Sequence, residues 1–330
     1  MATTLFHHAD TLLHDMGLGH PERPDRIRAI LARLDGPDFA ALERREAPEA
    51  TRAALERVHP AAYLDMLDDL APRDGTLVRL DGDTAMNNGT LAAARRAAGG
   101  AVAAVDAVLG GTCANAFVAT RPPGHHAEPA RAMGFCFLGN AVVAARHAQV
   151  AHGIGRVAIV DFDVHHGNGT QAIVWDDPSI FYGSTHEMPL FPGTGARSER
   201  GAHDTVVNAP LPPGADGTLF RSAMEEAILP RLEAFGPELV IVSAGFDAHR
   251  RDPLATLRLE AADFAWVTAR LMDVAERHAG GRLVSVLEGG YDLEGLGLSV
   301  AAHVATLMGR DPGSIPAIGL SRPDRAATSS

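Results

Sequence analysis

The chain has 330 residues, 29 of them basic and 41 acidic, and its formal charge of −12 argues against a general nucleic-acid binder. It contains no lysine, which excludes a Schiff-base lysine and a Walker A loop, and its two cysteines, Cys113 and Cys136, argue against a disulfide framework. No apolar run reaches the roughly 18 residues of a membrane span, so we expect a cytoplasmic protein without a membrane partner.

The predicted elements alternate between strands and helices over most of the chain. The helices show apolar residues at intervals of three and four, and the strands are short runs of β-branched and apolar residues. In chain order, the predictions are a strand at 4–6, helices at 25–34, 61–70 and 89–109, a strand at 116–119, a helix at 140–151, strands at 157–160 and 180–182, a helix at 218–235, a strand at 239–242, a helix at 260–278, a strand at 283–287 and a helix at 293–308. Strands separated by helices indicate βαβ units, a parallel sheet and right-handed crossovers.

The length allows one large or two ordinary domains. No Pro/Ser-rich linker, charge block or low-complexity stretch interrupts the chain before its last ten residues. The polar segments described next are spread from the middle of the chain to near its end, so two domains would divide them. We therefore predict one domain over residues 1–320 and a flexible tail over residues 321–330.

Four of the predicted strands lead into polar residues at their carboxyl ends. The segments that follow them contain, in chain order, His125 and His126, then Asp161, Asp163 and His165, then Asp247, and finally Tyr291. The carboxyl ends of parallel strands lie along one edge of a sheet, and ligands bind in the crevice beyond that edge. We therefore expect these side chains to meet in space although they span much of the chain.

Asp163 and His165 are separated by one residue, so they point the same way on extended backbone. Together with Asp247 they would supply three ligands to a divalent metal and leave one position open for water, which is the pattern of catalytic zinc. The alternative is that an Asp and a His after a strand cap the next helix or hydrogen-bond a loop. A dinuclear site would need further bridging carboxylates, and the corresponding positions hold Gly167, Asn168, Phe246 and Ala248. One metal is therefore favoured over two.

His125 and His126 are adjacent, and two imidazoles near one reacting centre can divide the tasks of base and acid. Asp161 is a candidate partner for the far nitrogen of His125 and would raise the basicity of that ring. Asn168 is a candidate partner for His126. Because an amide does not stabilise an imidazolium as a carboxylate does, we expect the two histidines to differ in pKa. With 16 histidines in the chain, a solvated loop is the alternative.

Tyr291 follows Glu288 and two glycines, which allow a loop to approach a ligand closely. Its phenol could donate a hydrogen bond to an oxyanion, or it could be a core tyrosine after a glycine turn. Phe135 and Phe191 lie in Gly- and Pro-bounded segments near the same edge. They would either line an apolar tunnel or belong to the core.

Five segments together resemble the zinc-dependent histone deacetylase family, which has bacterial relatives among acetylpolyamine amidohydrolases and acetoin-utilisation proteins. The segments are Arg121–Glu128, Asp161–Gln171, Phe191–Gly195, Ser243–Ala248 and Glu288–Tyr291. The resemblance runs from about His20 to Val304, and Asn168 stands where class I members usually carry Asp, so the chain looks class II. The fold implied is the arginase-like α/β fold, a single domain with a central, mostly parallel eight-stranded sheet flanked by helices.

The resemblance implies a metal-dependent deacetylase that removes an acetyl or similar short acyl group from a primary amine. It implies zinc at Asp163, His165 and Asp247, and the sequence does not distinguish Zn²⁺ from Fe²⁺. Catalysis would involve His125, His126, Tyr291, Asp161 and Asn168, and substrate would contact Phe135, Phe191, Leu254, Gly134 and Gly289. A structural potassium ion would be held by Asp161, Asp163, His165 and Ser184. Arg26 would belong to an inner cavity for acetate release.

The substrate would be an acetylated lysine side chain or an acetylated polyamine. Leu254 stands where lysine deacetylases of class IIb place an apolar residue and where a polyamine-selective relative places Glu, so the lysine-type substrate is favoured. The alternative outside enzymes is a non-catalytic protein that binds acyl-lysine, which is disfavoured because no catalytic position of the motif set is missing. Homo-oligomerisation is left open.

Overall fold

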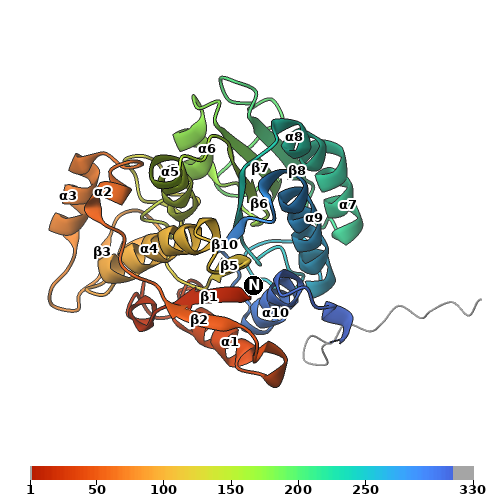
Figure 1. Cartoon of the computed structure of the whole chain (residues 1–330). Coiled ribbons are helices and arrows are strands. Elements are labelled where there is room, and N and C mark those ends of the chain that lie inside the picture. Colours follow the sequence, from red (N-terminus) through yellow and green to blue (C-terminus); the bar gives the residue numbers. More distant parts are fainter. Residues whose placement is uncertain (1, 315–330) are drawn as a thin grey trace, which may run out of the picture.

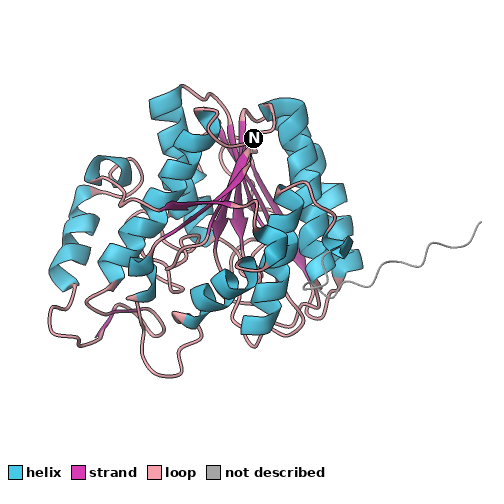
Figure 2. Cartoon of the chain, turned by 60° about the horizontal axis from the view of Figure 1, so that its bottom comes forward, coloured by secondary structure: helices cyan, strands magenta, loops and turns pink. Residues whose placement is uncertain are grey.

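An eight-stranded sheet runs through the centre of the computed structural model, which describes residues 2–314 (Figures 1 and 2). The strand order is β2-β1-β5-β10-β9-β6-β7-β8, and every neighbouring pair is parallel. The strands are β1 (Thr3–His7), β2 (Glu43–Glu46), β5 (Asn115–Val118), β6 (Val157–Asp161), β7 (Ile180–Glu187), β8 (Val206–Leu211), β9 (Leu239–Ala244) and β10 (Leu283–Leu287). A small antiparallel pair, β3 (Val78–Arg79) and β4 (Ala85–Met86), lies apart from it. The predicted α/β class and eight-stranded parallel sheet are confirmed.

Helices cover both faces of the sheet, so each face has its own apolar layer (Figure 2). Each strand contributes to both layers because successive side chains point to opposite faces of the sheet. In β5, Phe117 belongs to one layer, whereas Ala116 and Val118 belong to the other. The first layer includes residues of α1 (Asp25–Leu34), α7 (Gly217–Ala223), α8 (Leu229–Phe235), α9 (Ala261–Ala279) and α10 (Leu293–Leu307). The second includes residues of α2 (Arg52–Leu55), α3 (Ala61–Leu70), α4 (Thr90–Leu109), α5 (Asn140–His152) and α6 (Asn168–Val174).

Two strands at the borders of the sheet were not expected from the sequence. β2 has the sequence Glu-Arg-Arg-Glu and is mostly exposed, so it lacks the apolar run by which the other strands are recognised, although charge is common on edge strands. β8 pairs with β7, and this pairing keeps Gly183 to Glu187 extended. The prediction that the strand ends at Tyr182 is therefore wrong.

The helix predicted at 218–235 is interrupted. α7 and α8 are separated by a wider π-helical turn, Met224–Ile228, and Pro230 lies at the start of α8. Proline has no N–H to donate to the preceding turn, so regular α-helical hydrogen bonding cannot continue through this position. The remaining predicted helices are present, with ends that differ by one residue at most.

The four strands predicted to carry polar ends are the four central neighbours of the sheet, β5, β10, β9 and β6. Because they are parallel, the segments that follow them all emerge at one edge. This arrangement brings together side chains from the middle and the end of the chain. Among residues 2–314, no helix is both long and apolar enough to cross a bilayer. The predicted tail at 321–330 lies outside the described residues.

Candidate active site

Three side chains that could ligate a metal converge at the carboxyl edge of the central strands. Asp163 and His165 follow β6, and Asp247 follows β9. His165 Nδ1 lies 3.2 Å from Asp163 Oδ1 and 3.2 Å from Asp247 Oδ2, and all three residues are buried. The ligands of a tetrahedral zinc ion with bonds of ~2.0–2.1 Å stand about 3.3 Å apart, so the spacing fits one such ion.

Backbone N–H groups orient the two carboxylates. Gly289 donates to Asp163 Oδ2 at 2.8 Å, and Val164 donates to Asp247 Oδ1 at 2.9 Å. A Cβ at position 289 would stand 2.0 Å from Asp247 Oδ2, so the close approach requires glycine. Gly289 thus packs against the carboxylates of Asp163 and Asp247 and is not among the residues that line the pocket described below. Its contact with substrate stays a prediction.

The electrostatics of this group favour a bound cation. Burial raises the pKa of Asp247 to about 7, and the charge of Asp163 adds to the increase. Burial alone would lower the pKa of His165, but its contacts with the two carboxylates raise it to about 10. A divalent ion binds ionised carboxylates and the neutral ring, and its charge would take the place of the ring proton. Two carboxylates and one imidazole therefore fit a divalent metal.

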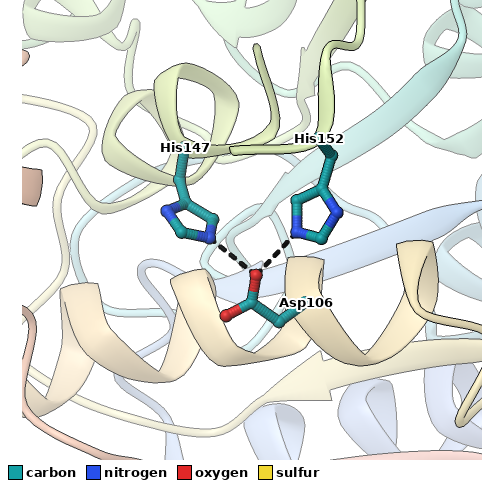
Figure 3. A group of neighbouring side chains, drawn as sticks. All are labelled: Asp106, His147 and His152. Atoms are coloured by element: carbon teal, nitrogen blue, oxygen red, sulfur yellow. Dashed lines mark hydrogen bonds and ion pairs between the residues drawn. The ribbon is translucent and has the colours of Figure 1, made fainter. Parts of the chain in front are cut away.

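A second group, Asp106, His147 and His152, joins α4 and α5 near the surface (Figure 3). His147 Nε2 and His152 Nε2 both donate to Asp106 Oδ1, at 2.6 and 2.7 Å. These are hydrogen-bond lengths, shorter than the separation between ligands of one tetrahedral ion. Arg57 donates to His147 Nδ1 at 3.1 Å, so the proton of the neutral His147 ring is on Nε2, the atom that a metal would need. We therefore interpret this group as a hydrogen-bonded clasp between two helices.

His125 is paired with a carboxylate. Its Nδ1 lies 3.1 Å from Asp161 Oδ2, which also accepts the hydroxyl of Tyr182 at 3.0 Å. Burial would lower the pKa of His125, but the charges of Asp163 and Asp161 outweigh burial and raise it to about 10. In this arrangement His125 is a cation at neutral pH.

His126 is paired with an amide. Its Nδ1 lies 2.8 Å from Asn168 Oδ1, an oxygen that can only accept, so the ring carries its proton on Nδ1. Burial lowers the pKa of His126 well below its usual value, and the charges of His125 and His165 lower it further. The two neighbouring rings, whose centroids are 3.9 Å apart, therefore differ in charge, as their different partners led us to expect.

Glu288 holds the loop that carries both histidines. Its Oε2 accepts the N–H groups of Gly124 and His125, at 2.7 and 3.1 Å, and its Oε1 accepts the hydroxyl of Ser243 at 3.1 Å. Sequence reasoning assigned no role to Glu288. The sequence feature that could have indicated a role is its position between a buried strand and two glycines. A carboxylate is buried at such a position only if hydrogen-bond donors such as backbone N–H groups satisfy it.

Tyr291 enters the same region from the end of β10. Its N–H donates to Asp252 Oδ2 at 2.7 Å, and its hydroxyl has no hydrogen-bond partner among residues 2–314. Burial raises the pKa of Tyr291 well above its usual value, so the phenol keeps its proton. The guanidinium of Arg26 lies 4.9 Å from the ring centroid.

Arg26 is fully buried and supports the backbone that carries Tyr291. It donates to the carbonyl oxygens of Gly290, at 2.6 Å, and of Glu288, and to Glu22 Oε1 at 3.0 Å. All three of its side-chain nitrogens are therefore occupied by the protein. The role of Arg26 in acetate release stays a prediction.

A pocket of about 230 Å³ reaches His165, one of the three candidate metal ligands. Its lining consists of Asp83, His126, Gly134, Phe135, His165, Leu190, Phe191, Leu254 and Tyr291. Four of the five predicted substrate contacts, Phe135, Phe191, Leu254 and Gly134, belong to this lining. Asp83 and Leu190 also line it, and neither was among those five. The pocket is therefore a mainly apolar channel that ends at polar, buried groups.

Ser184 lies in β7 directly opposite Asp161 of β6. Its hydroxyl lies 2.9 Å from His186 Nδ1, and the residue is fully buried. The structure thus brings together Ser184 and the strand end from which Asp163 and His165 follow, but Ser184 does not line the pocket.

Comparisons with known proteins agree with this geometry. Residues 20–307 match the model of the histone deacetylase domain family. The chain is 44% identical over 278 residues to the "Histone deacetylase-like amidohydrolase" of Pseudomonas aeruginosa, an alignment that covers 83% of this chain and 73% of that protein. It is 39% identical over 301 residues to a "Probable deacetylase" of Archaeoglobus fulgidus, covering 89% of this chain and 83% of that protein.

Two further similarities concern a eukaryotic relative and a solved structure. The chain is 37% identical over 351 residues to the mouse "Polyamine deacetylase HDAC10", with 100% of this chain and 51% of that protein covered. The crystal structure of the HDA15 HD domain superposes with a TM-score of 0.88 at 37% identity, covering 94% of this chain and 90% of the solved chain.

Proposed function

The chain belongs to the histone deacetylase family of zinc-dependent hydrolases and is a deacetylase of the amidohydrolase type, and from this premise we propose that it hydrolyses the amide of acetylated lysine side chains. The observation that carries the proposal is an apolar pocket lined by His165, which belongs to a buried Asp-His-Asp group. The family implies a catalytic metal. We assign it to Asp163, His165 and Asp247 as Zn²⁺, with Fe²⁺ as the alternative ion.

Different side chains around the pocket have different roles in the hydrolysis. When bound, the metal polarises the amide carbonyl and activates the attacking water. His126 accepts the proton of that water at Nε2, because its Nδ1 proton is engaged by Asn168. His125, kept charged by Asp161, stabilises the negative charge that develops beside it. Tyr291 donates its phenolic hydrogen to the oxyanion.

Hydrolysis breaks the carbon–nitrogen bond of the amide and moves one water proton to the departing nitrogen. The water oxygen forms a bond to the carbonyl carbon, and the carbon–nitrogen bond then breaks with its electron pair going to nitrogen. His126 returns its proton to the departing amine, so the ring ends the cycle neutral. The products are the free amine and acetic acid, which keeps the second proton of the water.

The lining of the pocket supports lysine-type substrates. An acetyl-lysine side chain is a four-carbon stem without charge near its amide, and each buried CH₂ contributes roughly 0.8 kcal/mol. Phe135, Phe191 and Leu254 provide the apolar wall for such a stem. An acetylpolyamine would place an ammonium partway down the same channel, and burial of that charge is costly unless a carboxylate meets it.

An acetylpolyamine is the second candidate substrate, and Asp83 is the observation that favours it. This residue is exposed and is the single carboxylate among the residues that line the pocket. Mouse HDAC10, whose name states a polyamine activity, is among the relatives. Leu254 is the position at which the two proposals diverge, since it lies on the wall and carries no charge.

Replacing Leu254 with Glu should shift the ratio of kcat/KM values for an acetylpolyamine and an acetyl-lysine peptide toward the polyamine. The new carboxylate would meet the second ammonium of acetylspermidine or acetylputrescine inside the channel, whereas a lysine stem would gain nothing from it. Both kcat/KM values are to be measured at one enzyme concentration.

The control is Leu254→Gln, which has nearly the same size as Glu but no charge. It should leave the ratio close to that of the parent chain. A parent that already prefers acetylpolyamines, or an active Glu variant with an unchanged ratio, would contradict the assignment of Leu254.

The proposed function as a whole is tested by a substrate panel on the metal-loaded protein. Acetyl-lysine peptides should be turned over faster than longer acyl-lysines and acetylated polyamines. Binding of acetyl-lysine peptide without turnover, at one metal per chain, would instead support the alternative of a non-catalytic acyl-lysine binding protein.

We also propose a structural potassium ion held by backbone oxygens of Asp161, Asp163 and His165 together with Ser184. Support comes from the pairing of Asp161 with Ser184 across β6 and β7, which gathers these groups at one strand end. The proposed compartment is the cytoplasm, as the composition led us to expect.

A further inference from the structure

Glu128 is linked to the histidine pair through one amide. Asn168 Oδ1 lies 2.8 Å from His126 Nδ1, while Asn168 Nδ2 donates to Glu128 Oε1 at 2.9 Å and to Met133 Sδ at 3.4 Å. Asn168 is buried, whereas Glu128 is partly exposed in a surface hollow that both residues line. A continuous chain of hydrogen bonds therefore runs from the surface to His126.

Glu128, the outer residue of this series of hydrogen bonds, determines the orientation of the Asn168 amide. An ionised carboxylate only accepts hydrogen bonds, so Asn168 must present its NH₂ group to Glu128. The amide oxygen is then turned toward His126, and the proton of the neutral ring lies on Nδ1. Nε2 keeps its lone pair. A flipped amide would instead present NH₂ to the ring and leave the proton on Nε2, which could not then accept a proton from water.

The backbone around Glu128 is held in place from two sides. Glu128 and Arg131 exchange two backbone hydrogen bonds, of 3.0 and 3.4 Å. His59 Nδ1 donates to the carbonyl of Pro129 at 2.9 Å, because its Nε2 accepts the N–H of Gly139 at 2.9 Å. The carboxylate of Glu128 is thus presented to Asn168 from an anchored turn.

We propose that Glu128 is a positioning residue that selects the reactive tautomer of His126 by fixing the orientation of the Asn168 amide. The inference rests on the proposed function, because it assumes that His126 exchanges its proton with the reactants at Nε2. An amide needs such a partner, since its two ends have nearly the same shape. An aspartate at position 168 would not, because both of its oxygens accept and either one gives the same tautomer.

Glu128→Ala should lower kcat on an acetyl-lysine peptide by about 10- to 100-fold, the usual effect of losing an outer partner of a site residue. KM should change by less than about twofold, because Glu128 does not line the substrate pocket. Glu128→Gln should lose less, because its amide oxygen can still accept from Asn168. An unchanged kcat in Glu128→Ala would overturn the proposal.

The decisive comparison repeats this substitution in an Asn168→Asp background. In that background the proposal requires that Glu128→Ala leave kcat undiminished. An increase in kcat also agrees with it, because the carboxylates at positions 128 and 168 would repel each other and the substitution removes one of them. A merely structural Glu128 would lower kcat by the same factor in both backgrounds, and that result would overturn the proposal. Asp176→Ala is the matched control: it removes a carboxylate from the same surface hollow and should leave kcat close to that of the parent.

A readout independent of turnover is the ¹⁵N NMR spectrum of the imidazoles in the metal-loaded protein, with the His126 signals assigned by difference from His126→Ala. The parent should show a protonated Nδ1 and a bare Nε2. Glu128→Ala should lose this single pattern and Glu128→Ala/Asn168→Asp should restore it. A parent without turnover but with this pattern would refute the proposed function alone, whereas a bare Nδ1 in the parent would refute the role of Glu128.

Discussion

Replacing Asp163 with Ala should remove the bound metal and the deacetylase activity together. Asp163 contributes one of three ligand atoms, and its loss leaves His165 and Asp247 with too few donors to hold a catalytic ion. Metal catalysis stabilises transition-state charge by several kcal/mol, so we expect kcat/KM to fall by at least about 10³-fold. Elemental analysis of the purified variant and its turnover of an acetyl-lysine peptide are to be measured on the same sample.

Two further variants make this test specific. Asp163→Asn keeps the size of the side chain and should also lose metal, which separates loss of a charged ligand from a general disturbance of the fold. Asp106→Ala removes the carboxylate of the helix clasp and should retain one metal per chain, because that group is held by hydrogen bonds. Full occupancy in Asp163→Ala, or two ions in the parent of which Asp106→Ala loses one, would contradict our assignment.

Tyr291→Phe should keep the fold and the metal but lose most turnover. The phenol is the one neutral donor at the end of the pocket that is not engaged by another group among residues 2–314. Removal of a single oxyanion donor typically lowers kcat by ~10²–10³. Phenylalanine retains the ring that packs beside Arg26 and Phe135, so metal content and thermal stability should stay close to those of the parent.

Tyr63→Phe is the matched control for Tyr291→Phe. The Tyr63 hydroxyl is buried and donates to the carbonyl of Phe137 at 2.7 Å, and Tyr63 does not line the pocket. Its loss should lower the free energy of unfolding by about 1 kcal/mol and leave kcat unchanged. A fall in kcat of less than about threefold in Tyr291→Phe would assign this tyrosine to the core rather than to the oxyanion.

The sequence predicted the candidate site best where polar, reactive side chains directly follow an apolar strand segment. Asp163 and His165 are two residues apart after an apolar run, and this spacing alone aims both at one point. Asp247 and Tyr291 follow other apolar runs, and a parallel sheet brings such strand ends to one edge. Their meeting was therefore predictable without any knowledge of the order of the strands. Their catalytic roles stay predictions until the variants above are measured.

Other features left no local signal. β2 is a run of charged residues, and its extended form depends on pairing with β1. The side chains of Glu128 and Glu288 accept hydrogen bonds from groups that lie 40 residues or more away in the chain. Long-range hydrogen bonds of this kind depend on the complete fold, so no short segment predicts them.

The position of β10 ties the appearance of activity to the synthesis of a late segment of the domain. β10 is the last strand of the sheet in the chain, yet it lies between β5 and β9 at the centre. Until it inserts, those two strands present unpaired edges, and the loop that carries Tyr291 and the Gly289 N–H is absent from the site. Pairing of strands so far apart in sequence is slow, because the loop entropy must be overcome before the contacts form. An emerging chain would thus remain unable to hydrolyse acetylated substrates until β10 and α10 have left the ribosome. In this interval the exposed strand edges make it most prone to aggregate.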